Sequence, residues 1–174
     1  LRGPPKVVGL ISLSEVANTY DCLDELLKES SWKQTNEESG LTYAYFDQHK
    51  SRCAFVLGQD IRDVQEAVEI ARVSDLLICV VDVADINMAG NYIDGSGHSV
   101  VSAIKAIGCP EVLFCYTGIS KVPQKQVKSV KQLVQDEAER QFGSAVKSGD
   151  MSKVALVARQ MCNMASRTLQ WRKH

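Results

Sequence analysis

The sequence lacks several features that would point to particular classes of protein. No apolar run approaches the roughly 20 residues that a transmembrane helix needs, and no low-complexity tract or short internal repeat is present. None of the six cysteines forms a C-x-x-C pair, so the spacing gives a zinc site no support. The 20 Lys and Arg residues are balanced by 21 Asp and Glu, which argues against a domain that holds nucleic acid by bulk charge.

The remaining composition is that of an ordinary folded domain. The 174 residues are 45% hydrophobic and 24% charged, so we expect one domain with a sizeable core over residues 1–174. Cys79 and Cys115 lie inside apolar runs, which predicts reduced, buried thiols in an intracellular protein. Residues 1–5 do not resemble a signal peptide, and position 1 is not Met. We therefore expect this chain to be a piece of a longer, multidomain protein.

Strand-like and helix-like patterns alternate along the chain. The pattern predicts strands at residues 6–13, 41–46, 52–57, 76–83, 112–116 and 154–157. It predicts helices at about 15–28, 61–73, 98–107, 123–142 and 160–171, with a mobile loop over residues 29–40. The order implies an α/β three-layer sandwich with a six-stranded, mostly parallel sheet and one antiparallel edge strand. It is the order of a P-loop GTPase core.

A P-loop GTPase needs G-x-x-x-x-G-K-[ST] after its first strand, where backbone N–H groups and the Lys hold phosphates and the hydroxyl holds Mg²⁺. If Gly9 is matched to the first Gly, Ser14 falls at the second and Glu15 at the Lys. Val16 then replaces the magnesium ligand. A carboxylate in place of an ammonium would repel a triphosphate rather than bind it.

Two further nucleotide motifs are also missing. In the D-x-x-G element, Gly58 matches the Gly but Phe55 stands where the Asp should be. The guanine-reading N-K-x-D element is replaced at residues 117–120 by Thr-Gly-Ile-Ser. Because three separate elements fail together, we predict that the chain is not an enzyme and binds no nucleotide cofactor or metal.

The chain resembles a known family along most of its length, in residues 6–13, 58–83, 116–123 and 142–171. The more particular matches are Ala-Arg-Val-Ser-Asp at 71–75, running into the strand at 76–82, and Thr-Gly-Ile-Ser at 117–120 with Pro123 after it. These resemble the N-terminal GTPase-like domain of the Tsr-type (twenty-S rRNA accumulation) pre-rRNA-processing factors. The related Bms-type ribosome-assembly GTPases keep a phosphate-binding loop, so its absence here favours the Tsr type.

This resemblance implies a non-catalytic domain of a ribosome biogenesis factor. Its implied partners are maturing small ribosomal subunits, with their rRNA and proteins, and other assembly factors, but no membrane and no small-molecule substrate. The implied location is the nucleus and nucleolus, with late pre-ribosomes in the cytoplasm. Two other functions remain open on the residues: an active GTPase with degenerate motifs, and a doubly wound signalling or interaction domain.

Four lysines are the candidate rRNA contacts: Lys121, Lys125, Lys128 and Lys131. Steps of four, three and three would place them along one face of the predicted helix, and no acid lies between the first and the last. Such a row suits a ladder of phosphate contacts, although a plain solvated helix face has the same pattern. The basic tail at 167–174 is a second, weaker candidate.

Two other clusters have simpler structural explanations. Asp82, Asp85 and Asp94 could bind a metal at the carboxyl end of the sheet, or they could cap helices and solubilise a loop. Gly90, Gly95 and Gly97, around His98, could form an anion nest or simply make turns.

Overall fold

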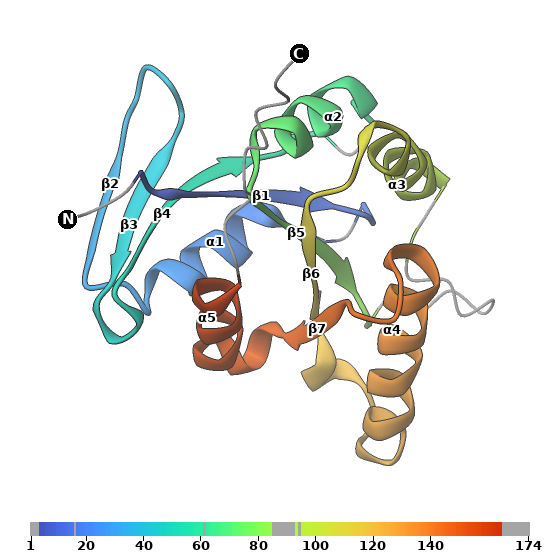
Figure 1. Cartoon of the computed structure of the whole chain (residues 1–174). Helices are drawn as coiled ribbons and strands as arrows, with labels where there is room; N and C mark the ends of the chain where they lie inside the picture. The colour runs from blue at the N-terminus through green and yellow to red at the C-terminus, as the bar shows by residue number, and fades with distance from the viewer. Residues whose placement is uncertain (1–3, 16, 61, 85–92, 94, 165–174) are drawn as a thin grey trace.

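The computed structural model describes residues 4–15, 17–60, 62–84, 93 and 95–164 (Figure 1). Within these residues the chain forms one seven-stranded sheet and five α-helices. The strands are β1 (Lys6–Ser12), β2 (Trp32–Thr35), β3 (Thr42–Phe46), β4 (Ser51–Leu57), β5 (Leu76–Asp82), β6 (Glu111–Thr117) and β7 (Lys147–Asp150). The helices are α1 (Thr19–Leu27), α2 (Val64–Val73), α3 (Gly95–Ile107), α4 (Val127–Phe142) and α5 (Val154–Asn163).

The strand order in the sheet is β2-β3-β4-β1-β5-β6-β7. The pairs β4–β1, β1–β5, β5–β6 and β6–β7 are parallel, whereas β2–β3 and β3–β4 are antiparallel. The predicted α/β class and the mostly parallel sheet with an antiparallel edge are confirmed. The predicted count of six strands is wrong, because β2 adds a strand at that edge.

Helices cover both faces of the sheet and make three layers (Figure 1). On one face α2, α3 and α4 pack on the side chains of Leu77, Cys79 and Phe114. On the other face α1 and α5 pack on those of Ile78 and Val80, among others. All residues of β5 up to Val81 are fully buried, as expected for a central strand covered on both sides.

Two N-terminal predictions need correction. Helix α1 begins at Thr19 rather than near residue 15, because the Asn18 side chain caps it by accepting hydrogen bonds from the backbone of Tyr20 and Asp21. Residues 29–40, predicted as a loop, contain β2, whose four residues are all exposed. This strand forms by backbone pairing with β3, and its sequence has no apolar pattern that would predict it.

The C-terminal third also differs from the sequence prediction. Residues 154–157 are the first turn of α5 and not a strand; the last strand is β7, whose sequence Lys-Ser-Gly-Asp has no apolar run. The long helix predicted from Pro123 begins later, at Val127, and two short 3₁₀ turns, Ile119–Lys121 and Gln124–Gln126, precede it. The predicted last helix, 160–171, begins at Val154 and ends at Asn163, and residues 165–171 lie outside the described residues.

Candidate functional site

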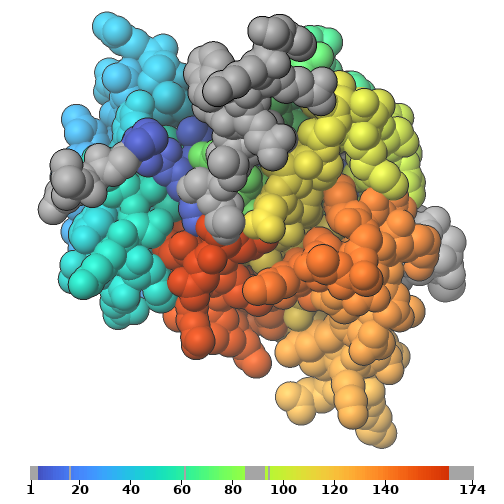
Figure 2. Space-filling view, in the orientation of Figure 1, coloured from blue at the N-terminus to red at the C-terminus, as the bar shows by residue number. Residues whose placement is uncertain are grey.

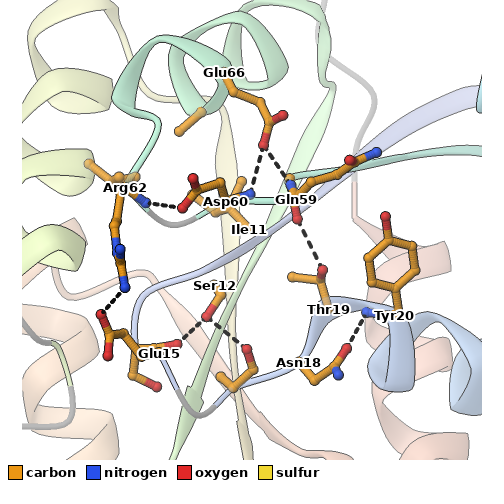
Figure 3. Close-up of a pocket in the computed structure, with 15 residues that line it drawn as sticks. Ile11, Ser12, Glu15, Asn18, Thr19, Tyr20, Gln59, Asp60, Arg62 and Glu66 are labelled. Atoms are coloured by element: carbon orange, nitrogen blue, oxygen red, sulfur yellow. Dashed lines mark hydrogen bonds and ion pairs between the residues drawn. The ribbon is translucent and has the colours of Figure 1, made fainter.

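A polar pocket of about 620 Å³ lies beside the carboxyl ends of β1 and β4 (Figure 3). Its walls are the segment that joins β1 to α1 and the segment that joins β4 to α2. Ligands of open α/β sheets bind outside the carboxyl ends of the strands. The pocket is therefore the place in this fold where a phosphate-binding loop would lie.

Gly9 does not belong to this pocket. It lies in the middle of β1, opposite Val56 on one side and Leu77 on the other. A Cβ at this position would lie 2.5 Å from both Ile70 Cγ2 and Ser74 Oγ, so the glycine lets α2 approach the sheet. The match of Gly9 to the first glycine of a phosphate loop is wrong by several residues, because β1 continues to Ser12.

The segment between β1 and α1 covers residues 13–18, which read Leu-Ser-Glu-Val-Ala-Asn. Counting the motif from the end of β1 puts Leu13 and Asn18 at the two glycines. Thr19 and Tyr20 then fall at the Lys and the Ser or Thr. Neither of these two alignments places a lysine at the lysine position of the motif. Val16, which the first alignment put at the magnesium ligand, lies outside the described residues.

A carboxylate of the chain itself engages the second wall of the pocket. Glu66 Oε1, from the first turn of α2, accepts hydrogen bonds from the backbone nitrogens of Gln59 at 2.5 Å and Asp60 at 3.3 Å (Figure 3). The backbone N–H of Gly58 donates to the carbonyl oxygen of Leu10 at 2.8 Å. Successive backbone N–H groups of this kind form anion sites when they are open; here they serve internal acceptors.

Two side-chain contacts join the walls (Figure 3). Arg62 Nη2 lies 3.4 Å from Glu15 Oε1, and both side chains are mostly exposed. Thr19 Oγ1 donates to the carbonyl oxygen of Gly58 at 3.1 Å. The pocket lining carries three carboxylates, on Glu15, Asp60 and Glu66, against the single guanidinium of Arg62. Its formal charge is thus negative, the opposite of what a phosphate site requires.

Phe55 stands at the position of the D-x-x-G aspartate, and it belongs to the core. Its side chain is 1% exposed and packs edge-on against Phe46, with ring centroids 6.3 Å apart. This side chain offers no ligand to a metal ion.

The turn after β6 stands where a GTPase would carry its guanine-reading motif. Thr117 Oγ1 donates to Asp82 Oδ2 at 3.0 Å, which ties the ends of β5 and β6 together. Gly118 has a φ of +82°, and a Cβ there would lie 2.8 Å from Asp82 Oδ1. The backbone geometry of this turn therefore needs glycine.

Two members of the predicted acidic and glycine clusters, Asp82 and Gly97, have structural roles. Asp82 Oδ1 also accepts from the backbone of Ala84 at 2.8 Å, so both of its oxygens serve the turn. Asp85, Asp94 and Gly90 lie outside the described residues. Within the described part of the chain, no group of three possible ligands could hold a metal ion. Gly97 lies in α3, where a Cβ would meet the carbonyl oxygen of Leu13 at 2.1 Å.

The four candidate lysines do not share one helix. Lys121 and Lys125 lie in the two 3₁₀ turns, and Lys128 and Lys131 lie in α4. The first three are exposed, whereas Lys131 is half-buried, with its ammonium 3.8 Å from Asp150 Oδ2. The four lysines therefore do not form a single row along one helix, as predicted; they follow one another over two 3₁₀ turns and the start of α4. The two turns and the start of α4 project from the body of the molecule (Figure 2).

Lys128 and Lys131 also line a shallow hollow of about 490 Å³ with Gln124, Val127 and Gln132. The second candidate, the basic tail from Arg167 to His174, lies outside the described residues. No described helix is long and apolar enough to cross a membrane.

All six cysteines are free thiols. Cys79 and Cys115 are buried in the sheet, as predicted, and burial raises the pKa of each thiol. Burial also raises the pKa of the Cys22 thiol on α1 to about 12. None of these three buried thiols is therefore an activated nucleophile at neutral pH.

The sequence reasoning identified Glu15 but missed Glu66 and Arg62, which shape the pocket. Glu66 follows the true helix cap, Asp63, whose side chain accepts from the Glu66 backbone nitrogen. The pattern predicts a helix from residue 61, whereas α2 begins at Val64, and this three-residue shift conceals the place of Glu66 in the first turn. An acid in the first turn of a helix is common, so nothing in the pattern marks Glu66 as a loop contact.

No protein-family model matches the chain, and no curated protein matches it in sequence. Solved structures do match. Apo translation elongation factor SelB from Methanococcus maripaludis has a TM-score of 0.65 at 11% identity, over 96% of this chain and 37% of that one. The same factor with the GTP analogue GppNHp has a TM-score of 0.60 at 11% identity, over 95% and 36%.

A bacterial selenocysteine-specific elongation factor, EF-Sec, gives a TM-score of 0.63 at 12% identity, over 90% of this chain and 28% of that one. The chain therefore spans about a third of the length of these factors. At such identities the likeness concerns the fold alone. The chain has a GTPase-like fold, similar to the GTPase domain of translation factors.

Proposed function

We propose that this chain is a GTPase-like domain that works without nucleotide, as a binding module of a ribosome biogenesis factor. The observation that carries the proposal is the pocket beside β1 and β4, which has the position of a phosphate site but a negative lining. In this role the domain supplies shape and surface rather than turnover.

The chemistry of the pocket argues against a triphosphate. A bound GTP would bring several negative charges next to Glu15, Asp60 and Glu66, and only Arg62 would oppose them. Glu66 already accepts hydrogen bonds from two backbone N–H groups of the loop after β4, so these groups are not open to an anion. Binding would have to displace this carboxylate and break the contact between Arg62 and Glu15.

The ribosomal part of the proposal rests on the resemblance to the Tsr-type factors. The structural neighbours are translation elongation factors, which agrees with ribosome-related partners without naming one. We propose the maturing small subunit and its assembly factors as partners, in the nucleus, the nucleolus and on late cytoplasmic particles. Lys121, Lys125 and Lys128 are exposed on the projecting segment and are the proposed rRNA contacts.

Calorimetric titration of the chain with GTP and with GDP, each with and without Mg²⁺, tests whether the domain works without nucleotide. We expect no binding heat, and we expect nucleotide to leave the thermal unfolding temperature unchanged. Micromolar binding that depends on Mg²⁺ would contradict the proposal and favour an active GTPase with degenerate motifs. Co-sedimentation with pre-ribosomal particles tests the ribosomal half separately.

A further inference from the structure

The sheet has a second distinctive surface, at the antiparallel edge formed by β2, β3 and β4. Helices α2 and α3 lie over the middle of the sheet, whereas β2, β3 and β4 extend beyond them (Figure 1). Phe46 and Phe55, on one face of these strands, belong to the core beneath α1 and α5. The opposite face carries Trp32, Tyr43 and Tyr45, and we call it the aromatic face.

The strand register sets the aromatic face in rows. Trp32 pairs with Tyr45, and Tyr45 pairs with Arg52, so these three side chains follow one another across three strands. Directly paired residues have Cβ atoms about 4.5–5.5 Å apart. Tyr43 lies two residues from Tyr45 on the same face, about 7 Å along the strand, and it pairs with Gln34.

This surface is accessible and hollowed. The Trp32 side chain is 52% exposed although it is the largest kind of apolar side chain, and both tyrosines are half-buried. A hollow of about 530 Å³ is lined by Trp32, Gln34, Tyr43, Tyr45 and Arg52, among others. An indole left half in water at a hollow of this size is typical of a binding surface.

The residue types fit unpaired nucleobases. Aromatic rings and guanidinium planes stack on bases, and the row from Trp32 to Arg52 supplies three such planes in succession. The Gln34 amide can both donate to and accept from a base edge. The three strands carry no carboxylate. Arg52 lies on the aromatic face and gives it a positive charge, whereas Lys33 pairs with Ala44 and so lies on the opposite face.

We propose that the aromatic face binds single-stranded nucleic acid by stacking bases on Trp32, Tyr45 and Tyr43, with Arg52 beside the row. A proline-rich peptide also docks in aromatic grooves, but its recognition does not require a positively charged guanidinium, such as that of Arg52, in line with the rings. A duplex keeps its base faces stacked on one another and cannot offer them. The inference does not depend on the proposed function, because it follows from this face alone.

Fluorescence anisotropy with a labelled single-stranded RNA of about 12 nucleotides and no self-complementarity tests the proposal, with a DNA of the same sequence in parallel. We expect both to bind. Trp32→Ala and Tyr45→Ala should each weaken binding by about 5- to 150-fold, the range expected for the loss of one base stack. Trp32→Phe keeps an aromatic ring at this position and should retain most of the wild-type affinity. If the RNA bound more tightly than the DNA, this face would also contact the 2′-hydroxyl of the ribose.

The matched control is Tyr20→Ala, which removes an aromatic side chain of similar exposure, 48%, from α1. It should leave binding unchanged. Circular dichroism of each variant checks that the fold is retained. Equal competition by a duplex of the same length, or full binding by the folded Trp32→Ala variant, would overturn the proposal. Binding of a proline-rich peptide without binding of either oligonucleotide would also overturn it.

Discussion

Glu66 Oε1 lies 2.5 Å from the backbone nitrogen of Gln59, so an acid of α2 holds the loop that follows β4. The same oxygen accepts from Asp60, and Arg62 of this loop reaches Glu15 of the other wall. The contacts around the pocket thus form a chain from α2 to the end of β1. This arrangement stabilises the loop without an external anion.

Replacing Glu66 should loosen this loop. Glu66→Ala removes the acceptor for two backbone N–H groups, and we expect a loss of about 1 kcal/mol in the free energy of unfolding, measured by urea titration. Glu69→Ala on the same helix is the control, because Glu69 only pairs with Gln65 on an exposed surface. If both variants lost equally little stability, the Glu66 contacts would not hold the loop.

Glu15→Lys should not create a GTP site. The substitution adds a cation to the pocket lining, but Phe55 remains in the core and residues 117–120 still lack a guanine-reading acid. Glu66 also continues to accept from the loop N–H groups. We expect calorimetry with GTP and Mg²⁺ to show no binding. Stability should change by less than about 0.5 kcal/mol, because the ion pair with Arg62 is exposed. GTP binding by this single variant would mean that the negative charge of the lining alone excludes the nucleotide.

Lys6 should matter for the attachment of α5. Its side chain is only 8% exposed, and its ammonium donates to the carbonyl oxygens of Met161 at 3.1 Å and Cys162 at 3.2 Å, and to that of Met164. These carbonyls end α5, where a cation is favourable.

Lys6→Met keeps the length of the side chain but leaves the carbonyls without their donor. We expect a loss of about 2 kcal/mol in the free energy of unfolding. Hydrogen exchange should also become faster in α5 than in α4. Lys33→Met, at an exposed position of β2, should have little effect. Uniform exchange in both helices of the Lys6→Met variant would argue against a local role.

The central strand gives a simple test of the core. Leu77 in β5 is fully buried in the layer beneath α2 and α3. Leu77→Ala should cost about 2–5 kcal/mol in the free energy of unfolding, from lost transfer energy and the cavity left behind. Leu133→Ala removes the same atoms from a side chain that is 51% exposed and should cost far less. A loss under about 1 kcal/mol for Leu77→Ala would contradict its placement.

The parts of the fold that sequence could predict are those that burial determines. Residues 76–81 are a continuous apolar run, and they form all of β5 except its last residue, Asp82. By contrast, β7 reads Lys-Ser-Gly-Asp and exists because its backbone pairs with β6. The strand β2 is exposed at every residue and exists through pairing with β3. Pairing of this kind leaves no apolar period in the sequence.

The candidate sites failed to appear in the sequence for the same reason. Glu15 and Arg62 are 47 residues apart and meet only once β1 and β4 lie side by side. Trp32 joins the aromatic row only because β2 is a strand, and the sequence predicted a loop there. By contrast, the sequence shows directly that residues 13–20 contain no lysine and residues 117–120 no acid, because such motifs are local.

The projecting lysines give the last prediction. Lys121, Lys125 and Lys128 are all exposed, so changing the three together to Glu should alter the free energy of unfolding little. It should weaken co-sedimentation with rRNA-containing particles and reduce its salt dependence, because fewer counterions are released on contact. Lys131 is left in place, since its contact with Asp150 has a structural role. Lys125→Ala alone should have a smaller effect in the same direction.

The matched control applies the same change of charge elsewhere. Lys50, Lys105 and Lys147 are also exposed, and they lie in the turn before β4, in α3 and in β7. If binding depends only on net charge, the control triple variant will weaken it as much as the first one. If the projecting segment is the contact, the control will bind nearly as wild type at physiological salt, because charges more than about 8 Å from the interface are largely screened. Wild-type binding by the first variant at both low and physiological salt would leave these lysines as a solvated surface.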